Sequence, residues 1–267
     1  MITCNNLFNN PNLKTLDEKG SFTVLEYQRD LSVSPYNAVS SYYMSEMGVR
    51  KRQVLARMNG MGIVTQAGAM QWTTGSVSAT TGLKGVGDLF GKAIKGKMAG
   101  ESTIKPEYTG NGLLMMEPTY KYILLENVAD WGSGLVLEDG LFMACEASVK
   151  RSVVARSNLS SAALGGEGLF NMVLRGQGVA VLESYVPREE LIEFILEDDE
   201  LKIDGSMAMA WSESLKFTVE RSGKTLIGSA ASGEGLVNVF RGTGRVLMSP
   251  VAVTSPYASA SPSIARF

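Results

Sequence analysis

A chain of 267 residues is long enough to bury a sizeable core, and its 25 Lys and Arg against 27 Asp and Glu leave a formal net charge of −2. This balance gives no electrostatic indication of a nucleic-acid partner. The sequence contains no histidine, which excludes serine–histidine and cysteine–histidine catalysis as well as imidazole metal sites.

The two cysteines, Cys4 and Cys145, are far apart in the sequence and show neither metal-ligand spacing nor a disulfide framework. Cys145 follows an apolar run and is interpreted as a small buried hydrophobic residue. We find no signal-peptide pattern and no apolar run near the ~20 residues that a membrane helix needs. The expectation is therefore a soluble cytoplasmic protein.

The N-terminal 50 residues predict a lead-in followed by two strands. Residues 1–20 are polar and rich in asparagine, so order is expected from about Ser21. Aromatic and β-branched residues predict strands over 22–27 and 38–44, with a turn at 34–37 between them. A compact basic cluster then favours a solvated edge or loop: Lys51, Arg52 and Arg57.

A short glycine-framed motif recurs three times in the rest of the chain. Its copies are Ala99-Gly100-Glu101-Ser102, Gly165-Gly166-Glu167-Gly168 and Ser232-Gly233-Glu234-Gly235. The glutamates are 167 − 101 = 66 and 234 − 167 = 67 residues apart, and a Gly-x-Gly pair follows each copy. Regular spacing over most of the chain predicts three internal repeats, with the motif as the equivalent corner of each.

Short glycine-punctuated segments within each repeat predict antiparallel strands rather than helices. The pairs Asp139-Gly140 and Asp204-Gly205 are 204 − 139 = 65 residues apart, and each predicts a tight β-hairpin because such turns need positive φ at both central positions. The Gly-x-Gly pairs are interpreted as turns of the same kind. The acidic run 197–200 predicts a further turn, and residues 251–267 form a tail rich in Ser, Pro and Ala.

The first repeat carries a longer insertion, residues 83–98, in which apolar residues follow helical spacing. Four lysines against one aspartate make it basic and nominate it for binding to a surface: Lys84, Lys92, Lys95 and Lys97. Its glycines weaken an isolated helix, so it needs a surface to lie on, either a membrane or the body of the protein itself.

The motifs resemble a known family. The Gly-Glu-Gly corners, the Asp-Gly segments and the Ala-Gly-Ala-Met sequence at 67–70 are similar to those of bacterial relatives of the altered-inheritance-of-mitochondria biogenesis protein, over about residues 50–250. Those relatives are grouped with the tryptophan RNA-binding attenuator-like superfamily. The resemblance implies an all-β prism of three units around a pseudo-threefold axis, without an assigned molecular function. The first corner departs from the pattern, because Ser102 replaces its last glycine.

Two interpretations of the corner glutamates remain open. If Glu101, Glu167 and Glu234 converged on the axis, they would form a carboxylate cluster suited to a hard cation. In the other interpretation, each carboxylate accepts backbone N–H bonds at its own corner. Phosphate binding by the Gly-x-Gly pairs lacks a Walker lysine, and RNA binding lacks interleaved basic and aromatic residues.

The sequence therefore predicts an all-β, pseudo-threefold β-prism of three antiparallel repeats with at most one short helical insertion. The expected organisation is a lead-in with two strands at 1–50, one domain at 51–250 with repeats of about 51–130, 131–196 and 197–250, and the tail. We expect a non-catalytic structural or interaction protein without a cofactor, whose partner is a protein or an anionic membrane surface, and a homo-oligomer is compatible with this expectation. The alternative is a small-molecule or ion-binding module, with RNA binding less favoured.

Overall fold

The computed structural model describes residues 2–81, 105–155, 170–204, 207–221 and 236–251. These residues are mostly strands, with one short α-helix and three brief 3-10 helices, which confirms the prediction of an all-β protein. The elements in chain order are β1 (Leu13–Lys19), β2 (Phe22–Tyr27), η1 (Pro35–Asn37), α1 (Ala38–Glu46), β3 (Arg52–Asn59), β4 (Ile63–Thr65), β5 (Met70–Thr80), β6 (Glu107–Met116), β7 (Tyr122–Asn127), η2 (Val128–Trp131), β8 (Leu135–Leu137), β9 (Phe142–Glu146), β10 (Lys150–Ala155), β11 (Phe170–Arg175), β12 (Val179–Ser184), η3 (Arg188–Glu190), β13 (Ile192–Asp204), β14 (Ala208–Ser212), β15 (Lys216–Arg221) and β16 (Leu236–Met248).

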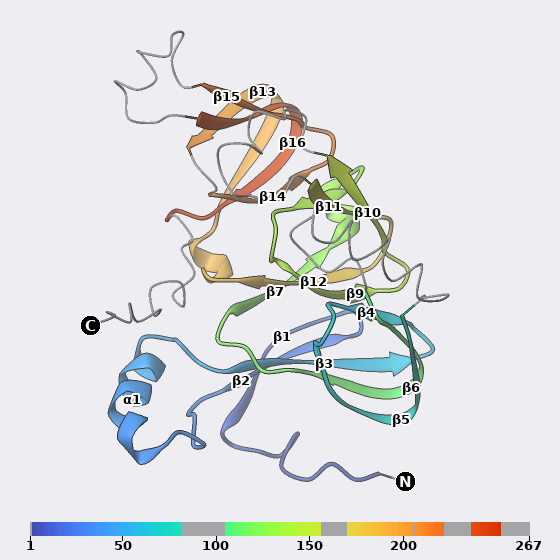
Figure 1. The fold of residues 1–267 in the computed structure, drawn as a ribbon, viewed down its shortest axis with the longest axis vertical. Coiled ribbons are helices and arrows are strands. Elements are labelled where there is room, and N and C mark those ends of the chain that lie inside the picture. Colours follow the sequence, from blue (N-terminus) through green and yellow to red (C-terminus); the bar gives the residue numbers. More distant parts are fainter. Residues whose placement is uncertain (1, 82–104, 156–169, 205–206, 222–235, 252–267) are drawn as a thin grey trace, which may run out of the picture.

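The strands form two antiparallel sheets (Figure 1). The nine-stranded sheet has the order β1-β2-β3-β6-β4-β9-β12-β7, with β5 also paired to β6, and occupies the lower part of Figure 1. The seven-stranded sheet has the order β10-β11-β8-β14-β16-β13, with β15 also paired to β16, and lies above it. Among the described residues, no helix is long and apolar enough to cross a membrane.

The same pairing scheme occurs in three successive units, β3–β6, β7–β12 and β13–β16. In each unit the two strands of one hairpin pair with each other: β5 with β6, β10 with β11, and β15 with β16. The first strand of each unit (β3, β7 and the N-terminal half of β13) pairs with the segment after the Gly-x-Gly pair. The next strand segment (β4, β8 and the C-terminal half of β13) pairs with the segment before it. This scheme is consistent with the predicted repeats.

Adjacent units are joined by one further strand pairing, which involves equivalent strands at both joints. Strand β4 of the first unit pairs with β9 of the second, and β8 of the second pairs with β14 of the third. Among the described residues, no strand pairing joins the third unit back to the first. The pseudo-threefold axis and the prism therefore remain predictions.

The core lies between the two sheets and extends along both. Its central cluster combines Val64 and Leu182 of the larger sheet with Leu137, Leu174 and Leu247 of the smaller one, all almost completely buried. Fully burying one such side chain contributes roughly 1.5–3 kcal/mol. The units are therefore held together by shared apolar side chains as well as by strand pairing.

The N-terminal strands belong to the larger sheet. Strand β1 starts at Leu13, earlier than the expected start of order at Ser21, and pairs with β2, which pairs with β3. Six of the seven β1 residues are exposed, so the sequence shows no apolar alternation there. Backbone pairing, rather than burial of side chains, places this strand.

The Gly-x-Gly pairs of the first and third units are not turns, contrary to the prediction. Gly110 and Gly112 lie inside β6, and Gly242 and Gly244 lie inside β16. A Cβ atom on Gly110, which has φ +117°, would stand 1.9 Å from the carbonyl oxygen of Ser76. These glycines allow one continuous strand to bend while a neighbouring backbone approaches closely.

Three other local predictions are also corrected. The segments around Asp139-Gly140 do not pair as a hairpin, because β8 and β9 belong to different sheets and pair with strands distant in sequence. Strands β13 and β14 likewise pair with β16 rather than with each other, and residues 205–206 lie outside the described residues. The acidic run 197–200 is a bulge inside β13, where Asp198 adopts φ +54°, and not a turn between strands.

The predicted strand over 38–44 is instead helix α1. Pro35 occupies the first turn of η1, which leads directly into α1, and the fixed φ of proline favours such a helical start. Valine and tyrosine residues in this segment favour a strand by composition. The composition wrongly predicts a strand here: the segment pairs with no described strand, and none of its side chains is buried.

Candidate docking surface

The residues predicted as sites all lie outside the described residues: Glu101, Glu167, Glu234, Lys84, Lys92, Lys95 and Lys97. Convergence of the three carboxylates and surface binding by the lysines therefore remain predictions. The structure does describe the strands on either side of each corner. Each corner falls in the connection between the two strands of its unit's hairpin, after the terminal pairs Thr80–Glu107, Ala155–Phe170 and Arg221–Leu236.

Helix α1 projects from the lower left of the body in Figure 1. Ser41 and Ser45 are its only partly buried residues, and the Ser45 hydroxyl donates a hydrogen bond of 2.9 Å to the carbonyl oxygen of Gln28. Ser41, Met44 and Ser45 line a small cleft against the body. This is the reverse of the usual arrangement, in which a helix on a globular protein packs its apolar side against the core.

The outward side of α1 and its flanks carries large apolar and aromatic side chains. We call this set the α1 surface, and its exposed fractions are 97% for Tyr36, 69% for Val39, 61% for Tyr42, 64% for Tyr43 and 79% for Met47. The rings of Tyr42 and Tyr43 contact each other edge to face, with centroids 5.5 Å apart. Val39, Tyr43 and Met47 are spaced four residues apart and therefore share one side of the helical segment. Exposed apolar side chains that gather on one side mark interaction sites.

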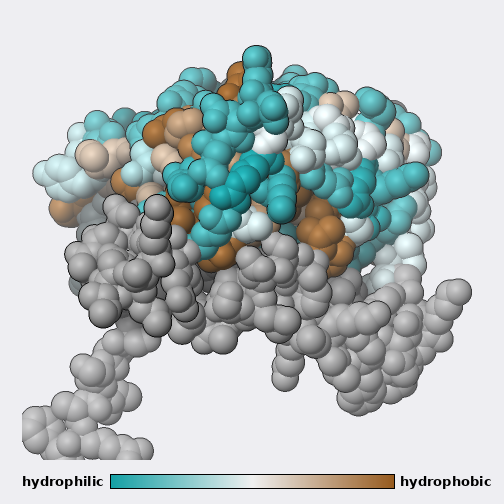
Figure 2. Space-filling model, turned by 90° about the horizontal axis from the view of Figure 1, so that it is seen from above, coloured by the Kyte–Doolittle hydropathy of each residue, from teal (hydrophilic) through white to brown (hydrophobic). Residues whose placement is uncertain are grey.

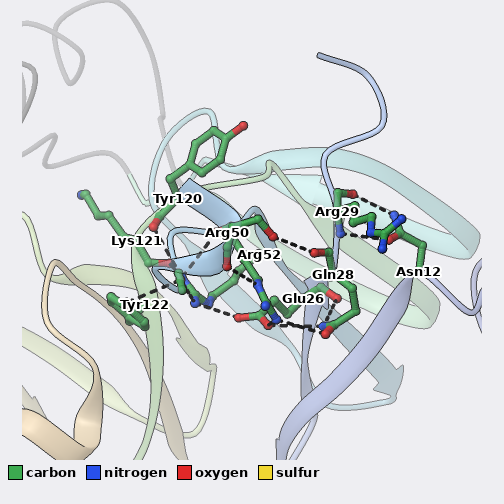
Figure 3. A network of polar contacts seen from close by, with 11 residues as sticks. Asn12, Glu26, Gln28, Arg29, Arg50, Arg52, Tyr120, Lys121 and Tyr122 are labelled. Atoms are coloured by element: carbon green, nitrogen blue, oxygen red, sulfur yellow. Dashed lines mark hydrogen bonds and ion pairs between the residues drawn. The ribbon is translucent and has the colours of Figure 1, made fainter. Parts of the chain in front are cut away.

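A buried charge network fixes the base of α1 to the body (Figure 3). Arg52 of β3 is 3% exposed and forms an ion pair of 2.7 Å with Glu26 of β2, which also pairs with Arg50 at 3.3 Å. The Arg52 guanidinium donates to the carbonyl oxygen of Gly48 at 3.0 Å and lies 4.1 Å from the ring centroid of Tyr122. The network thus joins β2, β3, β7 and the end of the helical segment.

A second polar group holds the loop before α1. The Asp30 carboxylate accepts hydrogen bonds from the Ser32 hydroxyl, from the Tyr120 hydroxyl at 2.6 Å and from the Lys51 ammonium. These bonds, that of Ser32 first, lower the pKa of Asp30 well below its ordinary value. The carboxylate is therefore ionised at neutral pH and ties residues 30–32 to the start of β7.

Beside this network lies an open pocket of about 390 Å³, which we call the tyrosine pocket. Its walls include Val49, Pro118, Tyr120, Lys121, Tyr122 and Tyr185. The Lys121 ammonium lies 5.0 Å from the ring centroid of Tyr185 and forms an ion pair of 3.1 Å with Glu183. The pocket shares Val49 and Tyr120 with the small cleft under α1, so the two features adjoin.

Within the described ranges, no group of three or more Cys, Asp or Glu residues is placed to hold a metal ion. Cys145 is completely buried, which confirms the interpretation of this residue, and burial raises the pKa of its thiol to about 11. Cys4 and Cys145 are both free thiols. A thiol with a raised pKa is a poor nucleophile at neutral pH.

The sequence analysis missed the α1 surface and misjudged its anchor. The basic cluster favoured a solvated edge, but Arg52 is buried in a strand that pairs on both sides, between β2 and β6. The available indication was Pro35, which is typical of a helix start, followed by residues that suit no buried strand face. Nothing in the sequence identifies Glu26 as the partner of Arg52.

The fold and the site define an all-β protein with two antiparallel sheets, joined units and an exposed apolar helix. The chain belongs to the mitochondrial biogenesis AIM24 family, whose model matches residues 50–251. It is 28% identical over 196 residues to an uncharacterised protein of Streptococcus pyogenes serotype M6, covering 70% of this chain and 76% of that one. A Streptococcus pyogenes protein of known crystal structure shares the fold, with a TM-score of 0.56 and 23% identity, covering 90% of this chain and 94% of that one.

The α1 surface precedes the residues that the family model matches. The tyrosine pocket combines Val49, just before that range, with residues inside it. Membership of the attenuator-like superfamily remains a prediction.

Proposed function

We propose that this protein is a non-catalytic interaction protein that docks through the α1 surface on an apolar surface of a partner protein. The observation that carries the proposal is the orientation of α1, whose Ser41 and Ser45 lie against the body while Val39, Tyr42 and Tyr43 face solvent. These apolar side chains are not buried in the protein's own core. Contact with a partner would remove them from water, which is favourable.

The composition of the α1 surface supports a protein partner. Aromatic residues and methionine are enriched at protein–protein interfaces, and tyrosine is frequent among the residues that dominate binding energy. An anionic membrane is less favoured at this face, because Arg50 and Lys51 form ion pairs with Glu26 and Asp30 and α1 itself contains Glu46 but no basic residue. The absence of histidine supports the non-catalytic part of the proposal.

Photocrosslinking in the native cell tests the proposal. We expect a photoreactive phenylalanine derivative in place of Tyr43 to give a protein adduct of defined mass, and the same group in place of exposed Lys14 on β1 to give none. Val39→Ser with Met47→Ser is expected to abolish the adduct without changing the thermal midpoint by more than about 2 °C, because both side chains are exposed.

Two outcomes would contradict the docking proposal. One is the same adducts at Tyr43 and at Lys14, which would indicate non-specific contact. The other is an adduct at Tyr43 that persists in the double variant. Flotation of the full chain with anionic liposomes, if lost in the double variant, would instead assign the α1 surface to a membrane.

The tyrosine pocket favours a second candidate function, the binding of a small planar or apolar molecule. Its volume of about 390 Å³ is within the range of ligand sites, and three tyrosine rings with one lysine offer stacking and a single charge. A metabolite present at 100 times its dissociation constant would add ~2.7 kcal/mol to stability. We expect a thermal-shift hit that Tyr185→Ala removes; a screen of aromatic and apolar metabolites that moves nothing would reject this function.

A further inference from the structure

The edge strands of the two sheets differ in how they are protected. Six described strands pair on one side only: β1, β5, β7, β10, β13 and β15. Five of them carry charged side chains, which oppose pairing with another chain. Strand β5 reads Met-Gln-Trp-Thr-Thr-Gly-Ser-Val-Ser-Ala-Thr over 11 residues and contains no charge. It is therefore the one described edge strand without this protection.

In the other two units, the strands equivalent to β5 are β9 and β14, and each pairs on its outer edge with a further strand. Thr73 of β5, Cys145 of β9 and Trp211 of β14 occupy equivalent positions in the three units. Each pairs with the residue that lies two places after the second glycine of the Gly-x-Gly pair in its own unit. These partners are Leu114, Ala180 and Val246, respectively. A register shift follows on the same side in all three strands. On their outer edges, Cys145 pairs with Val64 and Trp211 with Val136, both from short antiparallel apolar strands.

No described strand covers Thr73 as β4 and β8 cover Cys145 and Trp211. Among the described strands β5 pairs only with β6, and Thr73 is exposed. The strand is nonetheless firmly placed, because it pairs with β6 from Met70 to Thr80 and the Gln53 amide donates a 2.9 Å hydrogen bond to Gln71. An ordered edge loses little conformational entropy when a further strand joins it.

The opposite end of the molecule is closed to such pairing. Lys202 of β13 occupies the position of Val64 and Val136, and it forms an ion pair of 2.9 Å with Glu200 of the acidic run. Figure 2 views this end and shows hydrophilic side chains spread over much of its described surface. Head-to-tail pairing of β13 with β5 of another copy would bury Lys202, which is costly.

We infer that β5 is a self-association edge, at which two copies of this chain pair β5 antiparallel with β5 about Thr73. Among the described edge strands, β5 is the one whose pairing with itself brings no charge into the joined sheet. The pairing is isologous, like most homodimer interfaces, and Thr–Thr and Thr–Trp neighbours across the joint are favourable on a pleated surface. It would join the two nine-stranded sheets into one continuous sheet.

Charge substitution at Thr73 tests the inference in the full chain. We expect sedimentation velocity to show a concentration-dependent dimer for the wild type. Thr73→Lys and Thr73→Glu are each expected to weaken it at least about tenfold, because two like charges then face each other across the joint. An equal mixture of the two variants is expected to restore the dimer. Thr15→Lys on β1, an exposed threonine on an already charged edge, is the matched control and leaves dimerisation unchanged.

A crosslink provides a second measurement that does not depend on the charged variants folding. Thr73→Cys in a Cys4→Ser background is expected to form a disulfide-linked dimer on mild oxidation, because residues directly opposite on antiparallel strands have Cβ atoms about 4.5–5.5 Å apart. A wild type that stays monomeric at high concentration would overturn the inference. So would a dimer that survives both Thr73 charge variants, a mixture that fails to restore it, or a dimer lost instead through Val39→Ser with Met47→Ser.

Discussion

At the scale of single residues, the pair formed by Arg52 and Glu26 carries the connection between the N-terminal strands and the remainder of the larger sheet. Both side chains are almost fully buried. The Arg52 charge is compensated mainly by Glu26 and by backbone carbonyl oxygens, and the Glu26 charge by Arg52 and Arg50. The Arg52 Nε is the one buried side-chain nitrogen or oxygen without a hydrogen-bond partner among the described residues. The buried guanidinium holds the strands in place, but removing its charge from water costs free energy that its ion pair and hydrogen bonds must offset.

Arg52→Met should destabilise the protein by about 3–5 kcal/mol, because the buried Glu26 carboxylate loses its 2.7 Å ion pair and keeps only Arg50, at 3.3 Å, as a charged partner. The double variant Arg52→Met with Glu26→Leu should be more stable than Arg52→Met alone, since it also removes this under-compensated buried carboxylate. Urea unfolding at neutral pH measures both, with Lys14→Met on exposed β1 as a control that stays within about 0.5 kcal/mol of wild type. If the double variant lost as much free energy of unfolding as Arg52→Met and Glu26→Leu lose together as single variants, the two side chains would not interact.

At the scale of elements, the sequence predicted strands well where an apolar segment is buried along almost its whole length, and poorly where local geometry decides. The strand over 22–27 and the strand segments on both sides of Asp139-Gly140 agree with β2, β8 and β9. Residues 38–44 misled because strand-forming side chains occur in a helix that buries none of them. The Gly-x-Gly pairs misled because glycine serves a bend inside a strand as well as a turn between strands.

Gly110→Ala tests the interpretation of these pairs as strand bends. The added Cβ would lie 1.9 Å from the Ser76 carbonyl oxygen and the residue would keep φ +117°, so we expect a loss of about 3 kcal/mol or more. Gly68→Ala is the matched control, because Gly68 also has positive φ (+79°) but no atom within 4 Å of the added Cβ. Its expected cost is only about 1–2 kcal/mol of backbone strain, measured by denaturant unfolding. Equal costs at the two positions would refute the close-approach argument.

At the scale of the whole molecule, the spacing of the glutamate corners predicted an arrangement in which three hairpins are placed alike, and the pairing scheme agrees with it. The joints between units were not predictable. Ile63-Val64-Thr65 and Leu135-Val136-Leu137 are short apolar runs, and nothing in such a run specifies which distant edge it joins. The α1 surface escaped prediction for a related reason: exposure is a property of the folded molecule, and the same tyrosines would suit a buried strand.

The position of β16 has a consequence for how the chain is made. This strand provides pairing partners for β13, β14 and β15 at once, and it is the last strand that the structure describes. During synthesis from the N-terminus, those three strands are made before the segment that joins them. The pairing of the third unit is therefore completed only after residues 236–248 have been made, so this unit is the last to fold during synthesis.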